Sequence, residues 1–361
     1  MLQGERRGTF VMKTIVEYAS YLYDAFNVKL FPQVIDSPNE KFDEFLARVY
    51  RDFGQSTPTF NRIQIEKTHL ESPSPNDVMV AYSGGKDSAA VASFLQWETE
   101  YNPHAFYITD INKSYKSECD SVRESLDAIG IDESRRVAFS SGIKRNSKCE
   151  FIENPFKNFL IMTYMASCAF ERNICAISMG EYPDEKNDFI SAYSDNFGVI
   201  ALYVSALKTV FPQLKYLRVF NNEVEALFYL ILKGRLVGKW QSCILPDYRR
   251  GNVRKANIKR YPEYEHTFLT PPGKCLGCYK CLQEWFFLSV FGKIPINNDV
   301  VKKCKDAWRR QYAKDNNVDI ATVDADRGIA YMFGDLPRER ISEISSLDNL
   351  VAETRSNMDF I

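Results

Sequence analysis

The chain has 361 residues, 45% of them hydrophobic, and its 46 lysine and arginine residues nearly balance its 47 aspartate and glutamate residues. This composition is typical of a globular protein with a large core, and a net charge of −1 gives no reason to expect general binding to nucleic acid. Residues 1–11 lack the apolar run of a signal peptide, and the most apolar stretch, 159–170, is too short to span a bilayer. We therefore expect a cytoplasmic protein that makes no membrane contact.

The chain divides into four regions by its sequence pattern. Apolar residues recur with helical spacing before a turn-rich break at 72–77, and from about residue 234 the pattern changes to loops, cysteines and short helices. The expected regions are an N-terminal helical extension over 1–71, an α/β domain over 72–235, a cysteine-rich region over 236–290 and a C-terminal helical extension over 291–361.

The second region alternates short apolar strands with helices. This alternation predicts an α/β fold in which helices cover both faces of a parallel sheet, the doubly wound arrangement. The expected strands span 78–82, 105–109, 137–139 and 175–179, and the expected helices span 89–95, 121–129 and 158–172.

A glycine-rich hexapeptide, SGGKDS at 83–88, lies between the first expected strand and the helix that follows it. Glycines allow a tight turn that points successive N–H groups at one anion, and the helix N-terminus adds unpaired donors. The hydroxyls of Ser83 and Ser88 can donate to phosphate oxygens, whereas Asp87 would orient the loop or help to hold Mg²⁺. Lys86 can point to solvent or to a phosphate. The pattern favours a phosphate-binding loop over an ordinary glycine turn before a serine-capped helix.

Three cysteines, Cys275, Cys278 and Cys281, follow one another at three-residue intervals. Thiolates at this spacing can converge on one metal ion, and Cys243 is the natural candidate for a fourth ligand. Four thiolates would hold Zn²⁺ in a structural site without an open position. An iron–sulfur cluster, which also takes four cysteines, is the competing interpretation.

The hexapeptide in its strand–turn–helix setting resembles the loop of the ATP pyrophosphatases, the PP-loop superfamily. The resemblance implies a fold of the adenine-nucleotide α-hydrolase type, with Mg²⁺ and ATP at the loop and cleavage of ATP to AMP and pyrophosphate. It also implies an adenine site after the second strand. The residues that the resemblance assigns to ATP are Ser83, Gly84, Gly85, Lys86, Asp87, Ser88 and Asp110.

Within that superfamily, the chain resembles the 7-cyano-7-deazaguanine synthases, over about 78–287. The sequence WQSC at 240–243, before the CxxCxxC run, is one shared feature, and PFKN at 155–158 resembles that family's PGRN. The stretch DFISAYSD at 188–195 is similar to its D-Y/F-S-G-Y-P-D segment with one inserted residue; an alternative alignment uses 182–184. These enzymes convert 7-carboxy-7-deazaguanine to an amide and then a nitrile, with ATP and ammonia, on the route to queuosine.

The resemblance implies a ligase that forms C–N bonds and gives particular residues their roles. Lys157 would neutralise charge on the phosphates, acting as a point charge, with Asp87 and Asp195 as the other catalytic residues. The expected substrate-binding residues are Asn158, Tyr193, Asp195 and Asp184, although Asp195 can also be read as a solvated helix charge. The expected zinc ligands are Cys243, Cys275, Cys278 and Cys281.

The chain also departs from the synthases, with additions at both ends and a basic run at 249–260 that we interpret as a solvated loop or a macromolecular docking site. Extended synthase-like proteins occur in antiviral gene clusters, which suggests an alternative in which deazaguanine is joined to a protein amine. Further alternatives are tRNA thiolation, sulfonucleotide reduction and a non-catalytic nucleotide-binding partner. The expected ligands are ATP and a deazapurine, and nucleic acid is not expected. A protein is a candidate partner or substrate, and a homodimer is a candidate assembly.

Overall fold

A computed structural model describes the greater part of the chain after residue 74. The described residues are 75–108, 116–139, 157–182, 204, 207–208, 211–221, 223–237, 239–240, 247–260, 262, 275, 277–290, 297–324, 327 and 347–360. The expected N-terminal extension over 1–71 therefore lies outside them.

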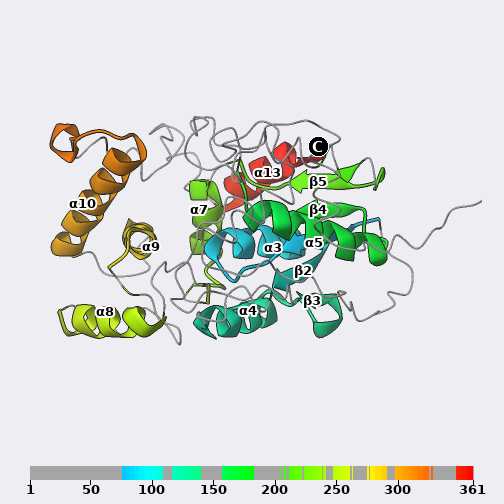
Figure 1. Ribbon diagram of the computed structural model, residues 1–361, viewed down its shortest axis with the longest axis horizontal. Helices are drawn as coiled ribbons and strands as arrows, with labels where there is room; N and C mark the ends of the chain where they lie inside the picture. The colour runs from blue at the N-terminus through cyan, green and yellow to red at the C-terminus, as the bar shows by residue number, and fades with distance from the viewer. Residues whose placement is uncertain are drawn as a thin grey trace, which may run out of the picture.

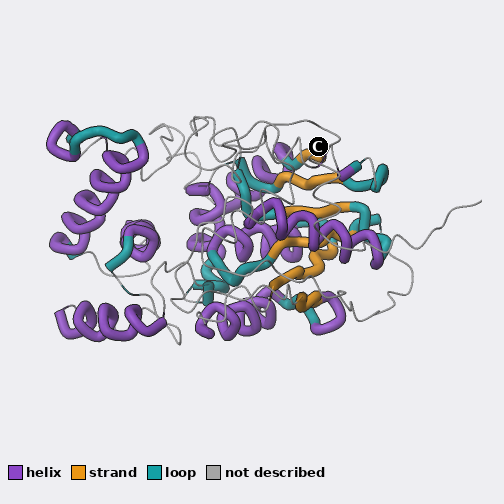
Figure 2. The backbone as a smooth tube through the Cα atoms, viewed as in Figure 1, coloured by secondary structure: helices purple, strands orange, loops and turns teal. Residues whose placement is uncertain are grey.

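The described chain forms an α/β structure around one six-stranded sheet, so the predicted α/β class is confirmed. Five strands are parallel, and the sixth joins the sheet in the antiparallel sense. Figure 2 shows the strands side by side, with helices around them. The strands are β1 (Asp77–Ala81), β2 (Asn102–Ile108), β3 (Arg136–Phe139), β4 (Ala176–Ser178), β5 (Lys215–Arg218) and β6 (Asp359–Phe360).

The strand order is β3-β2-β1-β4-β5-β6, so the chain adds strands on one side of β1 and then on the other. Val80 of β1 is in register with Ala105 of β2 and with Ser178 of β4. In open parallel sheets, the point where the strand order reverses leaves a crevice outside the carboxyl ends of the strands. The order therefore marks the carboxyl ends of β1 and β4 as the place to look for a ligand site.

The sheet is covered by helices because its central strands are apolar on both faces. β1 reads DVMVA, and its first four residues are buried, a pattern that requires packing on both sides. α3 packs on β1 and β2, whereas α5 packs on β1 and β4. The helices around the sheet in Figure 1 include α3 (Lys86–Glu98), α4 (Lys116–Ile129), α5 (Lys157–Glu171) and α7 (Glu223–Lys233), and a short 3-10 helix, η1 (Glu133–Arg135), precedes β3.

The remaining helices follow α7. They are α8 (Asp247–Arg260), α9 (Tyr279–Val290), α10 (Asn298–Asp315) and α13 (Leu347–Asn357), with a 3-10 turn, η3 (Ile320–Thr322). Figure 1 shows α8, α9 and α10 gathered at one end of the molecule, beyond α7. α10 packs along α9, and α9 meets α7, where the rings of Phe228 and Phe287 lie edge to face with their centroids 5.1 Å apart.

One hydrophobic core runs through both groups of helices. It includes Phe94 of α3, Trp285 of α9, Trp308 of α10 and Leu350 of α13. The chain then returns to the sheet, because α13 packs on α7 and β6 pairs with β5, with Phe360 opposite Leu217. This closing strand lies in the region for which only helices are expected from the sequence.

The predicted loop over the basic run 249–260 is wrong, because these residues belong to helix α8. The run contains no proline, and Val253 and Asn257, one helical turn apart, face the cysteine segment. Among the described helices, none is both long enough and apolar enough to cross a bilayer.

Candidate functional site

The glycine-rich hexapeptide leaves the carboxyl end of β1 and leads directly into α3. Gly84 has a φ of 77°, in the left-handed region that glycine adopts without strain, and Gly85 is the N-cap of the helix. Because Gly85 has no side chain, it makes no side-chain capping hydrogen bond to the first turn of the helix. An uncapped N-terminus at the carboxyl edge of a parallel sheet is a suitable place for an anion such as a phosphate.

The two serines of the hexapeptide hold the turn in shape. The Ser88 hydroxyl donates to the Gly85 carbonyl oxygen at 3.1 Å and accepts from the Ser83 N–H at 3.2 Å. The Ser83 hydroxyl oxygen accepts from the Gly85 N–H at 3.3 Å and lies 3.3 Å from the Ser88 hydroxyl oxygen. Ser83 is the exposed member of the pair, so its hydroxyl is the more accessible of the two expected phosphate donors.

The segment after β4 packs against the end of the hexapeptide, at Asp87 and Ser88. A Cβ atom built on Gly180 would lie 2.7 Å from the carbonyl carbon of Asp87 and 2.9 Å from the Ser88 nitrogen. Backbone and side chain cannot approach so closely, so glycine is the residue that fits at this position. The contact brings the ends of β1 and β4 together at the point where the strand order reverses.

The side chain of Lys86 points into the protein. It is 1% exposed, and its ammonium group donates to Asp87 at 2.8 Å and to Glu223, the first residue of α7. Burial alone would lower the pKa of Lys86, but the charges of Asp87 and Glu223 outweigh burial and raise it well above its usual value. Lys86 is therefore a charged internal anchor between α3 and α7, which answers the question that the sequence leaves open.

Asp87 also accepts a hydrogen bond from the Tyr182 hydroxyl at 3.1 Å. Tyr182 belongs to the same post-β4 segment as Gly180, so its hydroxyl ties that segment to the start of α3. Burial, followed by the charges of Asp87 and Glu223, raises the pKa of Tyr182 well above its usual value, and the phenol stays protonated as a donor. The loop-orienting role expected for Asp87 fits these contacts.

The three closely spaced cysteines form a compact buried cluster. The sulfur atoms of Cys275, Cys278 and Cys281 all lie within 4.8 Å of one another, and those of Cys275 and Cys281 are 3.8 Å apart. The backbone N–H groups of Gly277 and Cys278 donate to the Cys275 sulfur at 3.3 and 3.2 Å. Such donors stabilise a thiolate, so the three sulfurs fit a thiophilic ion such as Zn²⁺.

Helix α8 supports the cluster from one side. The Asn257 amide donates to the Cys275 carbonyl oxygen at 2.9 Å. A Cβ atom on Gly277 would lie 2.9 Å from a methyl group of Val253, so glycine allows the close approach of α8. On the other side of the cluster, Cys281 lies in the first turn of α9. The buried side chains of α9 hold this helix against the core.

The remaining predicted site residues divide into two groups. Lys157 and Asn158 begin α5, and their side chains are not described. The helix of a crossover between parallel strands starts at the carboxyl edge of the sheet, so both residues start on the same edge as the hexapeptide. The positions outside the described residues are Asp110, Asp184, Tyr193, Asp195 and Cys243.

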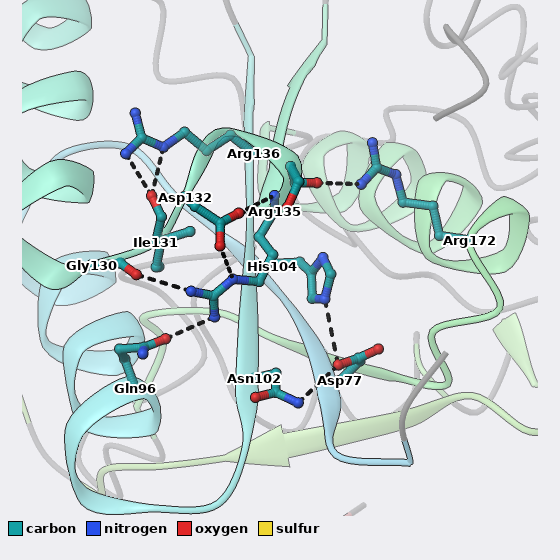
Figure 3. Close-up of polar contacts among 11 residues, drawn as sticks. Asp77, Gln96, Asn102, His104, Gly130, Ile131, Asp132, Arg135, Arg136 and Arg172 are labelled. Carbon is teal, nitrogen blue, oxygen red and sulfur yellow. Dashed lines mark hydrogen bonds and ion pairs between the residues drawn. The ribbon is translucent and has the colours of Figure 1, made fainter. Parts of the chain in front are cut away.

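Sequence reasoning missed the polar network at the opposite, amino-terminal edge of the sheet (Figure 3). Asp77 accepts from Asn102 at 3.2 Å and lies 3.5 Å from the Nε2 atom of His104. Burial lowers the pKa of His104, and this effect outweighs the opposing effect of the Asp77 charge. Burial therefore favours the neutral imidazole. Arg135 and Arg136 donate to carbonyl oxygens of the turn before β3, which they hold in place. The network lies at the other end of β1 from the hexapeptide.

Comparison with known proteins adds no assignment to these features. The chain matches no protein-family model and is similar to no curated protein. Its candidate site therefore consists of two parts defined by residues and geometry, a glycine-rich turn at the carboxyl edge of a parallel sheet and a buried cluster of three cysteines.

Proposed function

We propose that this chain is an ATP-dependent ligase of the PP-loop type, which cleaves ATP between its α and β phosphates and releases AMP. The observation that carries the proposal is the hexapeptide SGGKDS between β1 and α3, at the point where the strand order reverses. This is where doubly wound sheets bind nucleotides, and the uncapped start of α3 supplies N–H donors for phosphate oxygens.

The order β3-β2-β1-β4-β5 supports the finer assignment of a doubly wound fold, because successive strands extend the sheet in both directions from β1. The position of Lys157 at the start of α5 supports its role as the cation that faces the phosphates. Asp87, with about 30% of its side chain exposed, is the candidate residue to contact a Mg²⁺ ion that neutralises the triphosphate.

In the proposed reaction, a carboxylate oxygen of the substrate attacks the α-phosphorus of ATP. The bond between the α-phosphorus and the bridging oxygen breaks, and pyrophosphate leaves. A nitrogen nucleophile then attacks the carbonyl carbon of the acyl adenylate and loses a proton, AMP leaves, and an amide forms. Within this scheme, Lys157 and the N–H groups of the first turn of α3 stabilise negative charge on the phosphates.

The proposed substrate is the carboxylate of a 7-deazaguanine, and this part rests on the resemblance of the motifs at 155–158 and 188–195 to the deazaguanine synthases. Asn158 and Tyr193 would face the ring, and either Asp195 or Asp184 would accept hydrogen bonds from its N1–H and 2-amino edge. The cysteine cluster, with Cys243 as its proposed fourth ligand, would hold Zn²⁺ in a structural role.

The test incubates the purified chain with ATP, Mg²⁺, 7-carboxy-7-deazaguanine and ammonium, and analyses both small molecules and intact protein by mass spectrometry. AMP together with the amide or nitrile supports ammonia as the nucleophile. AMP with a mass addition on a protein amine supports conjugation, the reaction of the antiviral alternative. No AMP with any nucleophile overturns the proposal. Iron and visible colour in the purified protein would instead favour a sulfur-transferring relative.

A further inference from the structure

Two motifs that lie about 190 positions apart in the sequence flank one helix, α7. The hexapeptide begins α3, the cysteine run begins α9, and α7 lies between these helices in space, in contact with both. Glu223 is the first residue of α7, at the end of the helix that faces the hexapeptide.

The first link joins Glu223 to the hexapeptide. Its carboxylate accepts from the buried ammonium group of Lys86, the residue between Gly85 and Asp87. Asp87 holds the same ammonium at 2.8 Å, so Lys86 is fixed by one carboxylate from its own helix and one from α7. The position of Glu223 therefore decides one of the two contacts that hold Lys86 in the first turn of α3.

The second link joins Glu223 to the cysteine cluster. Burial raises the pKa of the Glu223 carboxyl, but the charges of Lys86 and then Lys280 bring that pKa below its usual value. The charge of Lys280, which lies between two of the cysteines, therefore acts on Glu223. The helices themselves meet where Phe228 of α7 packs edge to face on Phe287 of α9, at 5.1 Å. α9 is therefore joined to α7 by the charge of Lys280 in its first turn and by the packing of Phe287 in its second half.

We propose that Glu223 is a positioning residue that couples metal binding at the cysteine cluster to nucleotide binding at the hexapeptide. A metal ion held by Cys275, Cys278 and Cys281 fixes the first turn of α9 and with it Lys280. Lys280 then favours the position of Glu223 that anchors Lys86, and the first turn of α3 is ready for the phosphates. The proposal rests on the proposed ATP-binding function and adds a dependence between the two sites.

The coupling is thermodynamic, so it acts equally in both directions. If the metal tightens nucleotide binding by a given factor, the nucleotide tightens metal binding by the same factor. Coupling between two sites in one protein commonly amounts to roughly 5–150-fold, and we expect about tenfold here, because the path runs through the ion pair of Lys86 with Glu223, the charge of Lys280 and the contact between α7 and α9. A cluster with a purely structural role would alter folding without this reciprocity.

The experiment measures the dissociation constant of α,β-methylene-ATP, whose α–β link cannot be cleaved, by calorimetry on the full chain with and without Zn²⁺. Circular dichroism first checks that the metal-free chain is folded. We expect binding about tenfold tighter with Zn²⁺ in the wild type, and the same affinity in both states, within about twofold, in Glu223→Gln. The matched control is Glu133→Gln, an exposed carboxylate at the opposite edge of the sheet, which should keep the full ratio.

A second measurement starts from the zinc-loaded protein, so it holds even where the metal-free chain unfolds. A chelator of known affinity competes for the metal until equilibrium, and the dissociation constant of Zn²⁺ is determined with and without the ATP analogue. The analogue should tighten Zn²⁺ binding about tenfold in the wild type and in Glu133→Gln, but not in Glu223→Gln or Lys280→Gln. An equal effect in Glu223→Gln and wild type, or no effect in wild type, overturns the coupling. Failure of the analogue to bind in any state overturns the proposed function itself.

Discussion

Gly180 lies against the backbone of Asp87 so closely that a Cβ atom at position 180 would be 2.7 Å from the Asp87 carbonyl carbon. The contact joins the segment after β4 to the first turn of α3. It places the hexapeptide between the ends of β1 and β4, where the strand order reverses. A single methyl group at this position must therefore push the hexapeptide away from β4.

We predict that Gly180→Ala weakens the binding of an ATP analogue at least about tenfold and destabilises the fold by about 1–3 kcal/mol, the usual cost of overpacking. The measurements are calorimetric binding and urea unfolding. The matched control is Gly130→Ala, because Gly130 has a φ of 88° but no atom within 4 Å of an added Cβ. The control should destabilise the fold by about 1–2 kcal/mol and leave nucleotide affinity unchanged. Equal affinities in the two variants would show that the contact does not shape the site.

The central strands and the hexapeptide could be predicted from the sequence because their signals are local. The predicted strand 78–82 corresponds to β1 at Asp77–Ala81, and the predicted helix 158–172 corresponds to α5 at Lys157–Glu171. Apolar runs bounded by turns are visible in any window of a few residues. The three-residue spacing of the cysteines is equally local, and the predicted convergence of their sulfurs is confirmed.

The features that escaped prediction all depend on distant partners. β5, which reads KYLR, has only four residues, with an exposed lysine at one end, and it is a strand because β4 and β6 lie on either side of it. The basic run forms α8, whose Val253 and Asn257 pack on the cysteine segment. Nothing near Lys86 in the sequence identifies Glu223, 137 residues away, as its partner.

Removal of the metal should destabilise the chain, because three buried sulfurs that converge on one point lose their common ligand. We predict about one zinc ion per chain in the wild type by plasma mass spectrometry, and loss of zinc with a lower melting temperature in Cys281→Ser. Cys304→Ser is the matched control, since Cys304 is also buried, but its thiol donates to the Leu282 carbonyl oxygen, outside the cluster. Zinc retained in Cys281→Ser, or lost in the control, would contradict the assignment.

A buried carboxylate, Glu98 at the end of α3, joins that helix to α7 and to α13, where the Arg355 guanidinium lies 3.9 Å from it. It accepts from the Tyr229 hydroxyl at 3.2 Å and pairs with Lys233, and the Arg355 guanidinium of α13 donates to its backbone carbonyl oxygen. We predict that Glu98→Gln costs about 2–4 kcal/mol in the free energy of unfolding, because it leaves buried donors without a charged partner. The next carboxylate, Glu100, is exposed, and Glu100→Gln should change the free energy of unfolding by less than about 0.5 kcal/mol. Equal effects of the two substitutions would exclude the role of Glu98.

His104 should make the stability of the fold depend on pH. Burial lowers the pKa of its imidazole below the ordinary value of 6.5, so the unfolded chain takes up a proton more readily than the folded one. The sign follows directly: stability is complete above pH 6.5 and is lost as the pH falls towards the pKa of the folded state, by up to about 1.4 kcal/mol per pH unit for one proton. His104→Asn cannot take up that proton, so it removes this slope. The free energies of unfolding of wild type and variant, compared between pH 7.5 and 5, should therefore converge as the pH falls. Parallel curves over this interval would mean that His104 is protonated equally in the folded and unfolded chains.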